Sequence, residues 1–175
     1  MSKEIQKVDS SLSRKKTNKL DLSKINNEAL SSALSNIELP RLFHQLVIFI
    51  LDASDSMTWK GISGKTKGEE IHDQIVPIIQ RLQTSKNKNC FDISMIAFSQ
   101  ESKQFIKTKT VTEINTTNFD FNPCSHVGNH KTEIVESLLI AEDTINNYLS
   151  NNSSNSQALV IILSDGALDD QVEAL

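Results

Sequence analysis

The stretch that decides the fold covers residues 46–57 and reads Leu46-Val47-Ile48-Phe49-Ile50-Leu51-Asp52-Ala53-Ser54-Asp55-Ser56-Met57. Its first six residues are all apolar, and together with the preceding residues from Leu42 they are typical of a strand buried on both faces of a parallel sheet. Carboxylate and hydroxyl side chains follow at once. The stretch therefore predicts a buried strand that carries oxygen donors to one end of a sheet.

The remainder of the chain alternates between helical and strand-like patterns. Apolar residues at helical spacing predict helices over 69–82 and 132–149, and another helix starts at 168. Pro77 should kink or divide the first of these helices. Strands are predicted over 90–99, 103–110 and 158–163; the second suits an antiparallel edge and the third a buried position. We therefore expect an α/β fold with a doubly wound, mostly parallel sheet and one antiparallel edge strand.

Composition and charge narrow the class of protein. The 175 residues include 18 basic and 22 acidic side chains, for a net charge of −4, which argues against nucleic-acid binding. The longest apolar run is far shorter than the roughly 20 residues that cross a bilayer, so we expect no membrane segment. The N-terminus has no secretory signal pattern, and two cysteines make no disulfide framework. We therefore expect a cytoplasmic protein.

The charge is unevenly distributed and suggests two regions. Residues 1–42 carry a net charge of +3, whereas residues 43–175 carry −7. We interpret residues 1–41 as a flexible N-terminal arm, within which 24–39 could form a short amphipathic helix. Residues 42–175 then form one domain.

Oxygen-bearing side chains follow two of the predicted buried strands. Asp52, Ser54 and Ser56 come at the end of the first strand and would point to one side if the backbone stayed extended. Asp165 follows the last strand. Open α/β sheets bind ligands outside the carboxyl ends of their strands. Because hard oxygen donors without His or Cys suit Mg²⁺, Mn²⁺ or Ca²⁺, we expect a divalent cation here that keeps some of its waters.

The same residues resemble the metal-ion-dependent adhesion site of von Willebrand factor A domains. Asp52, Ser54 and Ser56 match the family's Asp-x-Ser-x-Ser motif, Asp165 matches its second aspartate, and Thr132 matches its metal-binding threonine. The resemblance implies direct ligation by the two serines and the threonine, with both aspartates acting largely through waters. It also implies a Rossmann-like fold, a non-enzymatic binding function, and a Glu or Asp from a partner protein at the remaining coordination position.

Within the family, the chain resembles bacterial intracellular members such as the tellurite-resistance type. It departs from the family pattern in having Asn129-His130-Lys131 before Thr132, where two glycines are common. It also ends soon after Asp165, where the family fold continues with further strands. We therefore expect the C-terminal strands to be missing. The chain is then a fragment, or the open edge of strand 158–163 pairs with a partner or a second copy.

Other interpretations of these residues stay open. Asp52 and Ser54 could simply cap the turn after the strand, and Thr132 could be only a helix N-cap. The alternative function is a Mg²⁺-dependent phosphatase or phosphotransferase of the haloacid-dehalogenase type, which also places an aspartate at a strand end. That family needs a second aspartate two residues later, where this chain has Ser54, so the metal-dependent binding module is favoured.

Overall fold

A computed structural model describes residues 43–152, 155–166 and 168–170 of the chain. The N-terminal arm expected over 1–41 lies outside the described residues, as does most of the helix expected from Leu168. The main elements follow one another in the order β1 (His44–Asp52), α2 (Lys67–Thr84), β2 (Phe91–Phe98), β3 (Ser102–Thr110), α3 (Val135–Asn151) and β4 (Ser156–Leu163). Short 3-10 helices η2 to η5 lie in the connecting loops, η2 (Asp55–Thr58) directly after β1 and η3 (Lys88–Cys90) directly before β2.

The four strands form one sheet with the order β3-β2-β1-β4. Strand β1 is parallel to both β2 and β4, whereas β3 is antiparallel to β2. The prediction of a mostly parallel sheet with one antiparallel edge strand is therefore confirmed. In the register, Asp52 pairs with Phe98 of β2 and Leu51 pairs with Leu163 of β4. The carboxyl ends of β1, β2 and β4 consequently lie level with one another.

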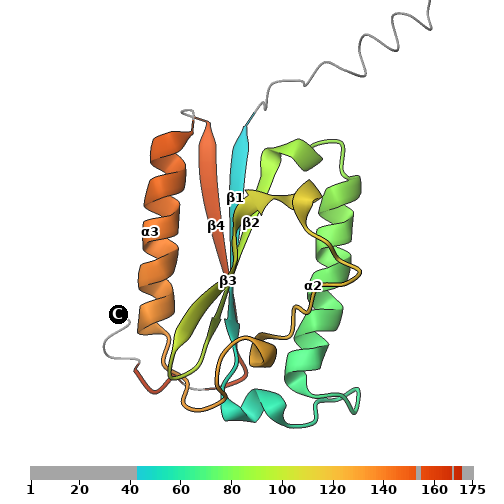
Figure 1. Cartoon of the computed structure of the whole chain (residues 1–175), viewed down its shortest axis with the longest axis vertical. Helices are drawn as coiled ribbons and strands as arrows, with labels where there is room; N and C mark the ends of the chain where they lie inside the picture. The colour runs from blue at the N-terminus through green and yellow to red at the C-terminus, as the bar shows by residue number, and fades with distance from the viewer. Residues whose placement is uncertain (1–42, 153–154, 167, 171–175) are drawn as a thin grey trace, which may run out of the picture. The chain divides into compact units, whose positions relative to one another are not determined.

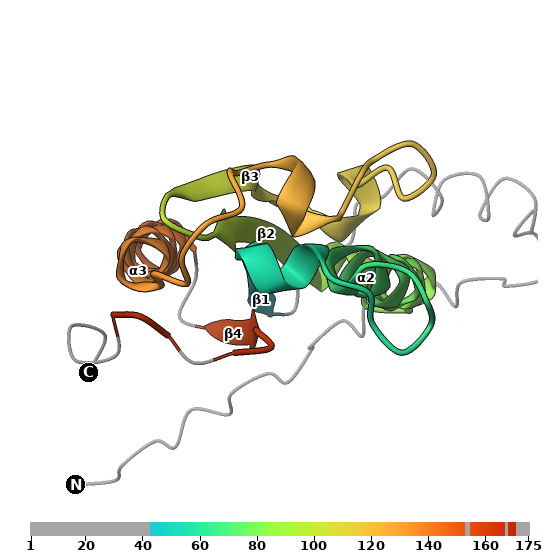
Figure 2. The same cartoon turned by 90° about the horizontal axis from the view of Figure 1, so that it is seen from below.

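Helices α2 and α3 cover opposite faces of the sheet, as the two views in Figure 1 and Figure 2 show. Side chains alternate between the faces of a strand, and β1 uses both. Its Phe49 packs in the same apolar cluster as Ile75 and Ile79 of α2, and its Ile48 packs in the cluster that contains Ala141 of α3. Burial on both faces explains why β1 is an unbroken apolar run.

Helix α2 differs from its prediction at its start and at Pro77. It begins at Lys67, two residues earlier than expected, because Thr66 and Glu69 form a capping box in which each side chain binds the other's backbone N–H. The helix continues through Pro77 without division to Thr84. Helix α3 begins at Val135 and not at Thr132, so Thr132 lies in the loop before it.

The expectation that strand 158–163 is buried on both faces is wrong for β4 (Ser156–Leu163). Its only partner among the described residues is β1. Apolar side chains consequently remain exposed on both sides of the strand, with Leu159 at 50% and Ile162 at 47%. Strand β4 is therefore an apolar edge of the described sheet. In the described part of the chain, no helix combines the length and apolar character needed to span a membrane.

Candidate metal centre

Asp52 is the last residue of β1, and its carboxylate is fully buried. Its Oδ1 accepts a hydrogen bond from the backbone N–H of Ser54 at 2.7 Å, and its Oδ2 accepts one from the Ser164 hydroxyl at 2.6 Å. Ser164 directly follows β4. The two bonds therefore fix the carboxylate between the ends of the two strands, which lie at the lower end of the sheet in Figure 1.

Ser54 and Ser56 bring their hydroxyl groups together, but not on an extended backbone. The chain turns after Asp52 into the 3-10 helix η2 (Asp55–Thr58), so the prediction of an extended segment through Ser56 is wrong. The turn still places the two hydroxyl oxygens 3.1 Å apart. Ser56 in turn donates to Oδ1 of Asp165 at 2.8 Å. Four of the five predicted ligand residues thus form one connected group across the ends of β1 and β4.

Backbone hydrogen bonds hold the loop that contains Thr132 beside this group. The neighbouring His130 carbonyl accepts a hydrogen bond from the Asp55 N–H at 3.1 Å, which places the loop beside η2. The N–H of Thr132 donates to the Asp169 carboxylate at 2.9 Å, and its carbonyl accepts from the Asp169 N–H at 2.9 Å. Within the described residues, no hydrogen bond joins its side chain to the other four. Its role as a ligand therefore stays a prediction.

Lys67 is a member of the site that the sequence interpretation missed. Its ammonium group forms an ion pair with Oδ2 of Asp165, so both oxygens of that carboxylate have donors. Burial raises the pKa of Asp165, but the hydrogen bonds from Lys67 and Ser56 and the charge of Lys67 outweigh it and leave the pKa below its ordinary value. A sequence signal did exist. Lys67 is the first residue of α2, where a cation faces the positive end of the helix dipole and is unfavourable without a partner.

Three more residues that the sequence did not single out hold the loop carrying Thr132. The Ser99 carbonyl, directly after β2, accepts from the Glu133 N–H at 3.0 Å, and the Ser99 hydroxyl donates to the Gly128 carbonyl. Asp170 accepts from the N–H of Val135 at 2.7 Å, the first residue of α3, which suits an acid at a helix N-terminus. Asp169 bonds Thr132 as described above. These contacts join the loop to both β2 and the segment after β4.

The donor set fits a hard divalent cation. It consists of carboxylate and hydroxyl oxygens, which Mg²⁺, Mn²⁺ and Ca²⁺ prefer. Buried carboxylates are costly unless they are paired or coordinate a metal, and in the described part of the chain no Lys, Arg or His forms an ion pair with Asp52. No three His, Cys, Asp or Glu side chains of the described residues form a group that could hold a metal. The site therefore depends on its serines.

Cys124 lies close enough to Asp52 for its thiol to respond to that charge. Burial, and then the negative charge of Asp52, raise the pKa of the Cys124 thiol to about 11. The thiol consequently stays protonated near neutral pH, whereas the thiolate is the form that binds metals and acts as a nucleophile. Cys124 therefore acts as a small, partly buried apolar residue.

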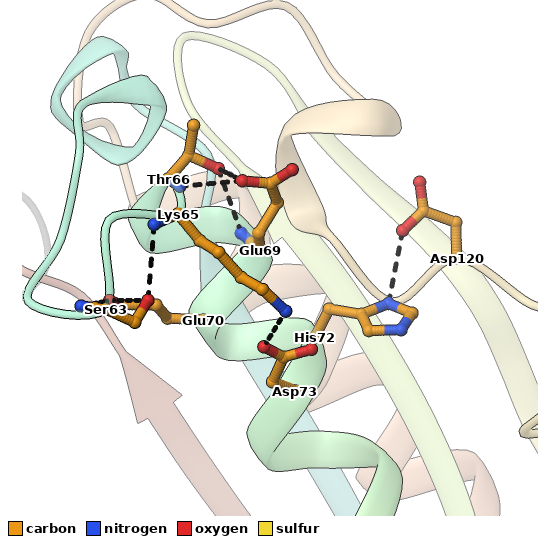
Figure 3. Close-up of polar contacts among 8 residues, drawn as sticks. All are labelled: Ser63, Lys65, Thr66, Glu69, Glu70, His72, Asp73 and Asp120. Carbon is orange, nitrogen blue, oxygen red and sulfur yellow. Dashed lines mark hydrogen bonds and ion pairs between the residues drawn. The ribbon is translucent and has the colours of Figure 1, made fainter.

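The loop between η2 and α2 forms a rim beside the site and is anchored to the helix below it (Figure 3). The Glu70 carboxylate accepts from the Ser63 N–H at 2.7 Å and from its hydroxyl at 2.6 Å, and these bonds lower the pKa of Glu70. Lys65 pairs with Asp73 at 2.6 Å, which raises the pKa of the Lys65 ammonium group. The Ser63–Glu70 hydrogen bonds, together with the Thr66–Glu69 capping box, therefore hold the start of α2, and with it Lys67, in place next to Asp165.

The chain belongs to the von Willebrand factor type A domain family, whose model matches residues 47–175. Both predicted aspartates and the intervening Thr132 lie inside the matched range. Domains of this family generally mediate protein–protein interactions. The family assignment therefore confirms the resemblance at the level of the domain, and the ligand roles of the five residues remain predictions.

Solved structures with a similar fold include three pilus proteins. PilB minor pilin from Streptococcus sanguinis has a TM-score of 0.55 and 17% identity over 74% of this chain and 31% of its own. The pilus adhesin SpaC from Lactobacillus rhamnosus GG has a TM-score of 0.57 and 15% identity over 73% of this chain and 16% of its own. The N-terminal domains of the pili tip protein Mfa5 from Porphyromonas gingivalis have a TM-score of 0.52 and 14% identity, covering 72% and 20%.

These similarities concern the fold alone, because the identities are low. The chain spans less than a third of the length of each of the three structures. No curated protein sequence matches the chain.

Proposed function

We propose that this domain is a protein-binding module whose binding depends on a divalent cation, with Mg²⁺ the first candidate and Mn²⁺ or Ca²⁺ the others. Asp52, Ser54, Ser56, Thr132 and Asp165 would hold the cation. When bound, it would offer a free coordination position to a Glu or Asp carboxylate of a partner protein. The observation that carries the proposal is the connected group of hard oxygen donors at the ends of β1 and β4, built around a buried carboxylate.

The protein's own residues support this function by being arranged before any partner arrives. Hydrogen bonds from Ser54 and Ser164 orient the Asp52 carboxylate. Asp52 and Ser54 are buried, but Asp165 is exposed and Ser56 partly so, which lets a protein surface approach that side of the group. Ligand sites held by rigid supporting contacts also bind with less loss of conformational freedom.

The haloacid-dehalogenase alternative has no comparable support. Such an enzyme would need a general acid two residues after Asp52, and Ser54 cannot take that role near neutral pH. A non-enzymatic module stays our proposal. Mg²⁺-dependent hydrolysis of a generic phosphate ester that is lost in Asp52→Ala would contradict it.

Capture of binding proteins under four conditions tests the proposed function. Immobilised native protein and Asp52→Ala are each exposed to cell extract in Mg²⁺ or in chelator, and the Asp52→Ala fold is checked by circular dichroism. We expect at least one protein that is retained by the native domain in Mg²⁺ and lost in the other three conditions. An identical set of captured proteins in all four would contradict metal-dependent binding.

A cytoplasmic location is also part of the proposal. It rests on the sequence, whose two cysteines make no disulfide framework. Labelling of the native protein in separated cell fractions tests this directly.

A further inference from the structure

The ammonium group of Lys67 already occupies part of the site. It contacts Oδ2 of Asp165, while Ser56 donates to Oδ1 of the same carboxylate at 2.8 Å. Ser56 is also joined to Ser54 across 3.1 Å. A positive charge carried by the chain itself is thus in direct contact with one of the two carboxylates that a divalent cation would use.

The position of Lys67 on its helix provides an independent observation. It is the first residue of α2 and is followed by Glu69 and Glu70, which suit the N-terminal turn. A lysine at this position opposes the helix dipole. This unfavourable interaction with the helix dipole is offset because the Lys67 side chain reaches the carboxylate of Asp165, 98 positions further along the chain.

The rim loop does not depend on this ion pair. Its anchors are the Thr66–Glu69 capping box and the Ser63–Glu70 hydrogen bonds, and neither of them uses the Lys67 side chain (Figure 3). The Lys67 ammonium group can therefore leave Asp165 without loss of the loop's contacts. It also lies 5.9 Å from the centre of the Trp59 ring, so its movement changes the surroundings of that ring.

We propose that Lys67 is a built-in competitor of the divalent cation, which holds Asp165 when the site is free and must release it when a cation binds. This inference rests on the proposed function, because it concerns the same site. Lys67 is a positioning and tuning residue that lowers the cation affinity, so the site is filled only where divalent ions are plentiful. Because the Lys67 ammonium group lies beside the Trp59 ring, its release on cation binding also changes the surroundings of that exposed side chain.

The expected size of the effect follows from the charges. If the released ammonium group stays within roughly 6 Å of the cation, Coulomb repulsion weakens binding by roughly tenfold even with the dielectric constant of bulk water. Removal of the Lys67 charge should therefore tighten Mg²⁺ binding about tenfold. Lys65 is a matched control, because Lys65→Met removes the same charge two positions away, from a side chain whose ion pair with Asp73 is exposed and contributes little to stability.

Titration of metal-stripped native protein, Lys67→Met and Lys65→Met with Mg²⁺ alone tests the inference, by calorimetry and by the emission of Trp59, the only tryptophan of the chain. Lys67→Gln and thermal melts guard against a variant that fails to fold. We expect Lys67→Met and Lys67→Gln to bind about tenfold tighter than native protein, with Lys65→Met unchanged. We also expect an emission change on binding in native protein and in Lys65→Met that is absent when Lys67 is replaced.

The outcomes separate this inference from the proposed function. If native protein binds Mg²⁺ and the Lys67 variants bind equally or more weakly, Lys67 is not a competitor, while the metal site stands. If both lysine variants tighten binding alike, the effect is one of overall charge and the inference is wrong. If neither native protein nor any variant binds, the proposed metal site fails and the inference fails with it.

Discussion

Replacement of Asp52 by Asn should leave the metal-free domain at least as stable as the native one, although Asp52 is fully buried. The change keeps the size of the side chain and removes its charge. The amide oxygen can still accept from the Ser54 N–H, and the Ser164 hydroxyl can turn to accept from the new amide group. The carboxylate's two hydrogen bonds therefore change strength but need not be lost.

Two opposing contributions decide the stability of Asp52→Asn: the weakening of two hydrogen bonds and the removal of a buried charge. A hydrogen bond to a charged group is worth about 1.5–3 kcal/mol and one between neutral groups about 0.5–1.5 kcal/mol, so two weaker bonds cost roughly 2–3 kcal/mol. Burial of a carboxylate without a cation costs several kcal/mol, which Asp52→Asn relieves. In chelator we expect the free energy of unfolding to be unchanged or higher by up to about 2 kcal/mol.

Magnesium should narrow or reverse this difference in stability, because it stabilises only the native domain. A cation that binds only the folded protein, present at ten times its Kd, adds about 1.4 kcal/mol to native stability, which corresponds to a Tm increase of roughly 5 °C for a domain of this size. Asp52→Asn should show no such gain. Asp143 is an exposed acid on α3 whose carboxylate accepts a hydrogen bond from Asn147 at 3.0 Å, so Asp143→Asn is the matched control and should keep the full gain.

Urea unfolding followed by circular dichroism, with chelator and with Mg²⁺, measures both effects. The reasoning is refuted if Asp52→Asn is strongly destabilised in chelator and gains as much stability from Mg²⁺ as the native domain.

Three further predictions concern the helix start, the open edge and the pH dependence. Thr66→Ala should lower the free energy of unfolding by about 1 kcal/mol, because the capping box with Glu69 is lost; an unchanged urea midpoint would contradict this. Native protein should self-associate through β4, and Ile162→Lys, which places a charge on the exposed edge, should reduce this in sedimentation velocity; a native monomer at high concentration would count against it. Burial raises the pKa of Asp120, but hydrogen bonds from Asn122 and Ser125 and the charges of His72 and His126 lower it overall. The stability that ionised Asp120 provides is therefore present above its ordinary pKa and is lost as the pH falls through the lower folded value, so Asp120→Asn should flatten the decline in stability below about pH 4. Urea midpoints measured across that range should converge, and parallel curves would refute the assignment.

The fold was predictable where the sequence pattern is local. The apolar run of β1 and the helical spacing in α2 report burial directly, so these elements and their order follow from the chain. The segment 111–129 had no such pattern because its order depends on distant partners. There, Phe119 and His126 stack with Phe105 of β3, His126 with a ring separation of 4.1 Å. Such contacts leave no periodic signal in the sequence.

In the candidate site, too, residues with a local sequence pattern were predicted and contacts between distant residues were not. Asp52, Ser54 and Ser56 were found because they follow a strand closely in sequence, and Asp165 because its strand resembles the first. The ion pair between Lys67 and Asp165, and the contacts of Asp169 and Asp170 with the loop of Thr132, join residues far apart in the chain. The resemblance led us to expect the open edge of β4, but the exposure of its two faces was missed, because an apolar strand has the same local pattern whether or not its faces are covered.

The central claim is that the donors at the ends of β1 and β4 bind a divalent cation, and titration calorimetry of metal-stripped native protein and Asp52→Ala with Mg²⁺ and Mn²⁺ tests it most directly. The account predicts a single site of modest affinity in the native protein, because such surface sites retain waters, and no binding by folded Asp52→Ala. An absence of heat from either cation at millimolar concentration in the native protein, or equal binding by Asp52→Ala, would contradict it.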